Sequence, residues 1–160
     1  TLDSGDNVIW FARYFKNTCQ NILLSGTWRT MGFSIPAAIM ARINQPETPV
    51  TAITGDGGLS MVMGELLTAP RYNLPVRIII INNASLSLEK NKMQSANLSI
   101  EEVDLNNPDF VQIAQSCGLD AYRPENIEEL KNILNQTRII DKSVVIDIPT
   151  MDYMIPGTKL

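Results

Sequence analysis

The sequence VTAITGDGG at residues 50–58, followed by VRIIIINN at residues 76–83, decides the fold. Each stretch begins with a short apolar run, at residues 50–54 and 76–81, of the kind typical of parallel strands buried on both faces. A helical pattern at residues 61–71 lies between them. A strand, a helix and a second strand form a right-handed crossover, so these residues predict a parallel sheet.

The same alternation continues outward from this unit. Further apolar runs at residues 22–24 and 144–148 predict two more strands. Helical patterns occupy residues 6–16, 35–43, 110–117 and 127–135, and Pro108-Asp109 opens the third of these. We therefore expect one doubly wound α/β domain over residues 1–160, with a mainly parallel sheet and helices on both faces.

Composition excludes several classes of function. The 160 residues carry a net charge of −4 and no basic block, which argues against nucleic-acid binding. The apolar run at residues 76–81 is too short to span a bilayer. The chain has no histidine, so Ser-His-Asp and Cys-His catalysis and His-ligated zinc cannot come from it. Its two cysteines, Cys19 and Cys117, are expected to be free thiols of a cytoplasmic protein.

In sheets of this kind, ligands bind beyond the carboxyl ends of the strands. Three such ends carry Ser25-Gly26-Thr27, Gly55-Asp56-Gly57-Gly58 and Asn82-Asn83. Backbone N–H groups of the glycine turn could bind a phosphate, and Mg²⁺ between Asp56 and a diphosphate would offset their mutual repulsion. Two structural alternatives stay open at this point. Asp56 could instead cap a helix, and the asparagines could serve only a turn.

These residues resemble a known family. Gly55-Asp56-Gly57, a spacing of 24 residues and then Asn82-Asn83 look like the cofactor motif of thiamine-diphosphate-dependent enzymes. The resemblance extends over residues 26–86, and more loosely through DFVQIAQSCGLDAYRPENIEELKNIL and KSVVIDIPT. Within the family, the chain most resembles pyruvate oxidases and quinone-linked pyruvate dehydrogenases, followed by acetolactate synthases.

The resemblance implies roles for individual residues. Asp56, Asn83 and the backbone carbonyl of Ser85 would bind Mg²⁺, while Gly57 and Gly58 would hold the diphosphate through backbone N–H groups. Asn7 would lie near the diphosphate. Further residues expected at the cofactor are Gly26, Thr27, Arg29, Met31 and Gly55. Among these, the bulky side chain that bends the cofactor would be that of Met31. Its bent shape brings an exocyclic amine beside the reactive carbon, and the carbonyl of Arg29 would accept a hydrogen bond from that amine.

The chain departs from the family pattern after Asn83. Relatives commonly continue with an aromatic residue or leucine and then glycine, whereas this sequence has Ala84-Ser85-Leu86-Ser87. Pyruvate oxidases tend to carry Glu and Gln near the positions of Lys92 and Met93. Glu89 could supply a catalytic carboxylate from a helix that also carries Lys92 and Met93, or it could be a solvated residue on the face of that helix.

The resemblance also implies parts that lie outside these residues. The glutamate that activates the cofactor belongs to a pyrimidine-binding domain, generally of a partner subunit, and FAD would bind a middle domain. We therefore expect a C-terminal domain excised from a longer homodimeric or homotetrameric protein, inactive by itself. The expected function is decarboxylation of a 2-oxo acid, most simply pyruvate, as in pyruvate oxidases. Acetolactate synthesis, or a non-catalytic module for cofactor binding or dimer assembly, are the alternatives.

Overall fold

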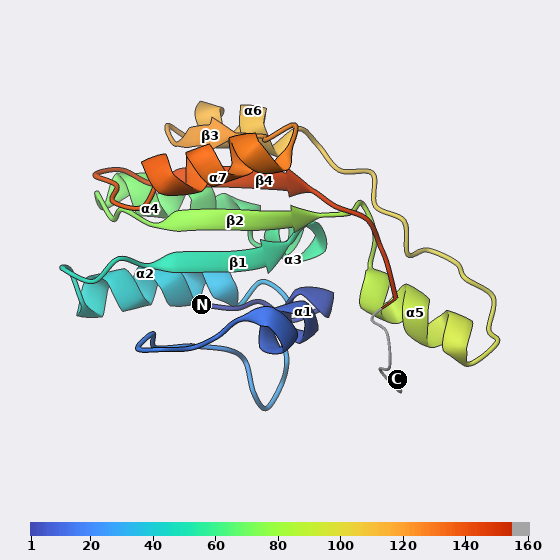
Figure 1. Ribbon diagram of the computed structural model, residues 1–160. Helices are drawn as coiled ribbons and strands as arrows, with labels where there is room; N and C mark the ends of the chain where they lie inside the picture. Colours follow the sequence, from blue (N-terminus) through green and yellow to red (C-terminus); the bar gives the residue numbers. More distant parts are fainter. Residues whose placement is uncertain (155–160) are drawn as a thin grey trace.

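A four-stranded, all-parallel sheet forms the centre of the computed structural model, which describes residues 1–154 (Figure 1). The strand order is β1-β2-β4-β3. The strands are β1 (Thr51–Gly55), β2 (Arg77–Asn82), β3 (Asp120–Tyr122) and β4 (Val144–Pro149). Gly55 pairs with Ile81, and Ile81 pairs with Ile148, so the three longer strands end together at one edge. The predicted α/β class is confirmed.

Helices cover both faces of the sheet. The α-helices are α1 (Asp6–Tyr14), α2 (Ser34–Asn44), α3 (Asp56–Met61), α4 (Thr68–Arg71), α5 (Ser87–Ser95), α6 (Phe110–Ser116) and α7 (Ile127–Gln136). On one face, side chains of α2, α3, α4 and α6 form the larger core with β1, β2 and β4. On the other face, α7 packs on β2 and β4 through Ile133, Val144 and Ile146. Figure 1 shows α7 in front of the sheet and α6 behind it.

The predicted strand at residues 22–24 is wrong. Only Leu24 forms an isolated parallel bridge, and its partner is Leu2, which also bridges to Ile53 of β1. The chain beside β1 is therefore the N-terminal segment, because the amide of Asp3 donates to the carbonyl of Ile53 at 2.9 Å. Leu23 and Leu24 are 45% and 47% exposed. An apolar run that is half exposed lacks the two-sided burial that stabilises a parallel strand.

Two other expectations change in detail. Residues 61–71 are not one helix: α3 already begins at Asp56, and a 3₁₀ helix, Met63–Leu67, links it to the single turn α4. The short strand β3 was not predicted, because three residues carry no clear periodicity. The predicted start of α6 is confirmed, since the Asp109 side chain accepts hydrogen bonds from the amides of Val111 and Gln112. No helix within the described residues has the length and hydrophobicity needed to cross a membrane.

Candidate functional site at the carboxyl edge of the sheet

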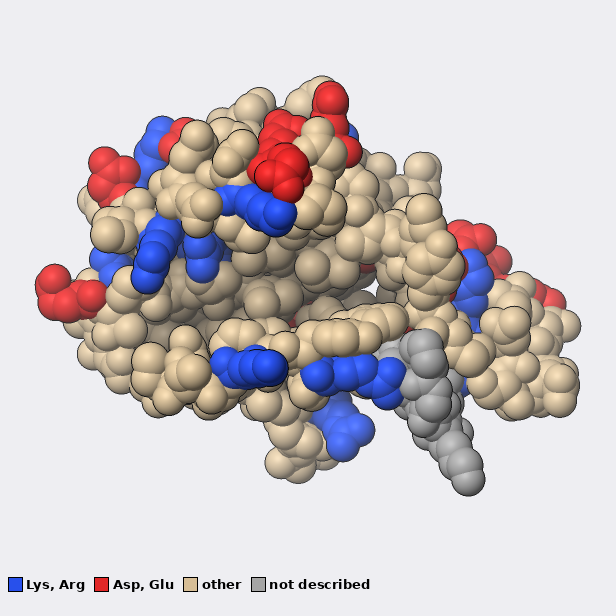
Figure 2. Space-filling view, in the orientation of Figure 1, with Lys and Arg blue, Asp and Glu red and all other residues tan. Residues whose placement is uncertain are grey.

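A pocket of about 1200 Å³ opens beside the carboxyl ends of β1 and β2. Its walls come from α1, the start of α3, the first turn of α5 and the segment after β4. Figure 2 shows a hollow between the sheet and the lower segment of the molecule, with Lys and Arg side chains bordering it below. Nearly all the predicted site residues line this pocket, namely Asn7, Gly26, Arg29, Met31, Gly55, Asp56, Gly57, Gly58, Asn83, Ser85 and Glu89. Thr27 is exposed and lies outside the lining.

The two glycines after Asp56 lie in tight packing, although at Gly57 the neighbours are the flexible tips of two side chains. A Cβ at Gly57 would lie 2.9 Å from Leu86 Cδ2 and 3.1 Å from Met31 Cε. A Cβ at Gly58 would lie 2.4 Å from Asp3 Oδ2, where no side chain fits. The close approach at Gly57 therefore places the tip of Met31 against the start of α3, at the floor of the pocket.

Asp56 is 2% exposed, and its carboxylate is only partly engaged. Its Oδ2 accepts a hydrogen bond of 2.6 Å from Asn107 Nδ2. No hydrogen bond from the described residues reaches Oδ1. The structural alternative in which Asp56 caps α3 is wrong, because Gly55 occupies the cap position and no side chain caps this helix. A buried carboxylate with one oxygen available is a suitable cation ligand.

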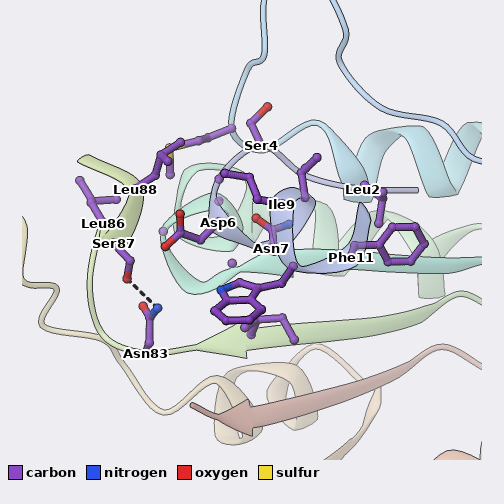
Figure 3. Close-up of a pocket in the computed structure, with 18 of the residues that line it drawn as sticks. Leu2, Ser4, Asp6, Asn7, Ile9, Phe11, Asn83, Leu86, Ser87 and Leu88 are labelled. Atoms are coloured by element: carbon purple, nitrogen blue, oxygen red, sulfur yellow. Dashed lines mark hydrogen bonds between the residues drawn. The ribbon is translucent and has the colours of Figure 1, made fainter. Parts of the chain in front are cut away.

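Asn83 and the turn that follows it form the opposite side of the site. The Asn83 Nδ2 donates to Ser87 Oγ at 2.7 Å (Figure 3), and its Oδ1 accepts from the Ser85 amide at 3.1 Å. Asn83 thus serves the turn, as one alternative predicted, while its oxygen retains a second lone pair. Ala84 adopts a left-handed conformation with φ of 53°, an uncommon geometry for a residue with a side chain.

The Ser85 hydroxyl has no hydrogen-bond partner although the residue is only 7% exposed and lines the pocket. Buried polar groups are normally paired, so this oxygen indicates a missing ligand or water. No cluster of three His, Cys, Asp or Glu side chains occurs in the described part of the chain. The donors at the ends of β1 and β2 are the Asp56 carboxylate, the Asn83 amide and the Ser85 oxygens. This set fits Mg²⁺, which commonly takes one or two carboxylates and completes its shell with phosphate and water.

Asp3 is a buried carboxylate that holds three chain segments together. Its oxygens accept hydrogen bonds from the amides of Gly32 at 3.0 Å and Phe33 at 3.1 Å, and from Thr54 Oγ1 at 2.7 Å. These bonds fix the turn after Met31 against β1. Sequence reasoning missed Asp3 because its partners are 29 to 51 residues away, and no local pattern signals them.

The charged residues at the pocket rim form local pairs. Glu89 accepts from Lys92 Nζ at 2.8 Å, and both side chains are about half exposed, which matches the alternative of a solvated helix face. On α1, burial raises the pKa of Asp6, and the charge of Lys92 opposes that rise. Asp6 and Asn7 face Asn83 and Ser87 across the pocket (Figure 3).

A parallel sheet with glycine-rich and asparagine-rich turns at one edge defines a class of cofactor-binding α/β domains. The family "Thiamine pyrophosphate enzyme, C-terminal TPP binding domain" matches residues 3–148. The chain belongs to this family. It is the C-terminal domain that binds thiamine pyrophosphate, a synonym of thiamine diphosphate.

Curated relatives agree with this assignment. A Bacillus subtilis protein named YdaP, described as thiamine pyrophosphate-containing, is 36% identical over 92% of this chain and 26% of its own length. Pyruvate oxidase from Lactiplantibacillus plantarum is 34% identical over 100% of this chain and 27% of its own. Acetolactate synthase from Bacillus subtilis is 31% identical over 96% of this chain and 27% of its own length. The chain thus spans about a quarter of the length of these relatives.

Proposed function

We propose that this chain binds the diphosphate and Mg²⁺ of thiamine diphosphate in a protein that decarboxylates a 2-oxo acid, most simply pyruvate. The observation that carries the proposal is the presence of oxygen atoms without hydrogen-bond partners at the strand ends, which we call unmet bonding capacity. Asp56 Oδ1 and the buried Ser85 hydroxyl lie in one pocket without partners among the described residues. The bound cofactor supplies an electron sink for the electrons released as a 2-oxo acid loses CO₂.

Each residue has a task in this proposal. Asp56, Asn83 and the Ser85 carbonyl hold the metal, while the backbone of Gly57 and Gly58 binds the diphosphate. Asn7, Gly26, Thr27 and Gly55 border the same region, although Thr27 would need to turn inward from its exposed position. Met31 supports the bent cofactor from the pocket floor, and its position against Gly57 supports this role.

The proposal includes a partner subunit that covers α1. Between residues 14 and 28 the chain exposes several large apolar side chains: Trp28 is 88% exposed, Tyr14 is 69% exposed, and Leu23 and Leu24 are about half exposed. Exposed large apolar residues concentrated in one segment are typical of an interface. A pyrimidine-binding domain of a second subunit is the occupant we propose, in a homodimer or homotetramer. Such a domain would supply the activating glutamate.

The second candidate reaction is acetolactate synthesis, because relatives with both names have similar identities to this chain. Pyruvate oxidation would pass electrons to FAD in another domain of the protein, whereas carboligation would join the product to a second 2-oxo acid. Anaerobic mixing of the complete protein with pyruvate separates the two. Bleaching of the flavin spectrum favours oxidation, and acetolactate formation without bleaching favours the synthase.

Calorimetric titration of thiamine diphosphate into the complete protein tests the cofactor site itself. We expect binding with Mg²⁺, loss of binding with a chelator, and loss in the Asp56→Ala variant. Asp120→Ala is the matched control, because it removes a partly exposed carboxylate that pairs with Lys142 and does not line the pocket. Binding that is independent of Mg²⁺ and Asp56 would contradict the proposal. No binding at all would favour a module that serves only assembly.

A further inference from the structure

A chain of polar side chains crosses the carboxyl edge of the sheet and ends on Asp56. Arg123 donates to Asp147 Oδ2 from Nε at 3.0 Å and from Nη2 at 2.6 Å. Asn82 Nδ2 donates to Asp147 Oδ1 at 3.0 Å. Asn107 Nδ2 then donates both to Asn82 Oδ1 at 3.1 Å and to Asp56 Oδ2 at 2.6 Å.

The direction of every hydrogen bond in this network is fixed by which atoms can donate and which can only accept. Asp147 is fully buried and, as a carboxylate, can only accept hydrogen bonds, so the amide of Asn82 must turn its Nδ2 toward it. The Oδ1 of Asn82 then faces Asn107 and also accepts from the Ala84 amide at 3.3 Å. Asn107 must therefore present its own Nδ2, because a flipped amide would place oxygen against two acceptor oxygens.

One consequence concerns the orientation of the Asp56 carboxylate. The 2.6 Å bond from Asn107 occupies Oδ2, whereas Oδ1 has no partner in the described part of the chain. A carboxylate held through one oxygen presents the other in a defined direction. Without Asn107, Oδ2 would be unpaired in a residue that is 2% exposed, and the carboxylate would be free to rotate.

We propose that Asn107 is a positioning residue that orients Asp56 for Mg²⁺ and links that orientation to the buried Asp147 and its partner Arg123. This inference rests on the proposed function, since it takes Asp56 as a metal ligand. Asn107 itself does not line the pocket. Partners in the outer shell of a metal site typically change metal affinity by about 10- to 100-fold when removed.

The test is the Mg²⁺ dependence of thiamine diphosphate binding by the complete protein, measured by calorimetry at a fixed cofactor concentration. In Asn107→Ala, the Mg²⁺ concentration at half-maximal binding should rise by about 10- to 100-fold. Asn106→Ala is the matched control, because Asn106 is the same residue type in the same loop and is exposed. Its midpoint should equal that of the wild type.

A smaller rise in Asn107→Ala, or an equal rise in Asn106→Ala, overturns the inference. If Asn107→Ala does not fold, Asn107→Ser is measured instead. Its single hydroxyl donor can serve only one of the two acceptors, so a several-fold rise is expected, and an unchanged midpoint overturns the inference. Failure of the proposed function is distinguishable, because the wild type itself would then show no Mg²⁺-dependent binding.

Discussion

Replacing Asp3 with asparagine should destabilise the chain strongly, although the change removes a single oxygen. Asp3 Oδ1 accepts from the amides of Ser4 and Phe33, and Oδ2 accepts from the Gly32 amide and Thr54 Oγ1. Asparagine has only one acceptor oxygen. Its Nδ2 would replace Oδ2, because the opposite orientation would set it against two backbone amides.

The cost follows from these four bonds. Thr54 can adapt, since its hydroxyl can donate to the Gly55 carbonyl at 3.0 Å and accept from the new Nδ2. The Gly32 amide cannot adapt, and it would face another donor. One unsatisfied buried donor costs about 1–3 kcal/mol, and the remaining bonds lose the strengthening effect of charge. We expect a loss of about 2–4 kcal/mol, a large part of the ~5–15 kcal/mol typical of a domain.

Urea unfolding of the 160-residue chain, followed by circular dichroism, measures this loss as a lower midpoint at an unchanged slope. Asp109→Asn is the control, because the Val111 and Gln112 amides both donate to the same oxygen of Asp109. An asparagine can keep both bonds there and loses only the partly exposed ion pair with Arg123, so its stability should stay within about 1 kcal/mol of wild type. If the two variants were equally stable, the role assigned to Asp3 would be refuted.

Three further predictions concern neighbouring features. Gly58→Ala should lower the free energy of unfolding by about 1–3 kcal/mol through overpacking. In Gly64→Ala the new Cβ would meet nothing within 4 Å, so the free energy of unfolding should rise by about 0.5–1 kcal/mol. Equal urea midpoints for the two variants would contradict this prediction. Because burial raises the pKa of Asp6 above 3.8, stability should fall as pH rises from that value through the raised pKa, and Asp6→Asn should remove this fall from pH-dependent unfolding curves. Arg123→Met should lower the free energy of unfolding by about 2–3 kcal/mol, because it leaves the fully buried Asp147 without its ion-pair partner. The loss is moderated because the Arg123 side chain is 41% exposed and water can partly replace it. An unchanged urea midpoint would show that the ion pair adds nothing to stability.

Local patterns in the sequence predicted most of the fold. The strands at residues 50–54, 76–81 and 144–148 and the helices near residues 110 and 127 match the structure to within two residues. Each of these strands is a short apolar run, and each of these helices follows a capping residue, Asp109 or Asn126. The run at residues 22–24 failed for the opposite reason. Its hydrophobicity resembles that of a strand, but burial depends on what packs against it, and nothing covers Leu23 and Leu24 on both sides.

The candidate site divides in the same way. The motif residues Asp56, Gly57 and Asn83 could be found because strand ends that share an edge bring them together. Asp3 and Asn107 could not be found, because they act through bonds that span 25 to 51 residues. Asn107 also stands beside Asn106, and nothing in the sequence indicates which of the two points toward Asp56.

Glycine motifs alone do not separate a binding site from a packing site. Gly57 and Gly58 are both explained by contacts inside the chain, with Met31, Leu86 and the Asp3 carboxylate. A domain that served only assembly would therefore need Gly58 equally, because the Asp3 carboxylate beside it is held by hydrogen bonds. The distinguishing evidence is unmet bonding capacity, because such a domain gains nothing by leaving buried polar atoms unpaired.

Part of this unpaired bonding capacity lies at the pocket. Among the described residues, the fully buried side-chain N or O atoms without a hydrogen bond are the hydroxyls of Ser34 and Ser85. The unpaired Asp56 Oδ1 is not one of these fully buried atoms. Ser34 begins α2 outside the pocket, whereas Ser85 lies in it, one residue after the left-handed Ala84. Strain and an unpaired hydroxyl in one turn both lower stability, and function is the usual reason that such costs persist. The turn after Asn83 therefore favours a ligand site over a purely structural role, even though its sequence departs from that of its relatives.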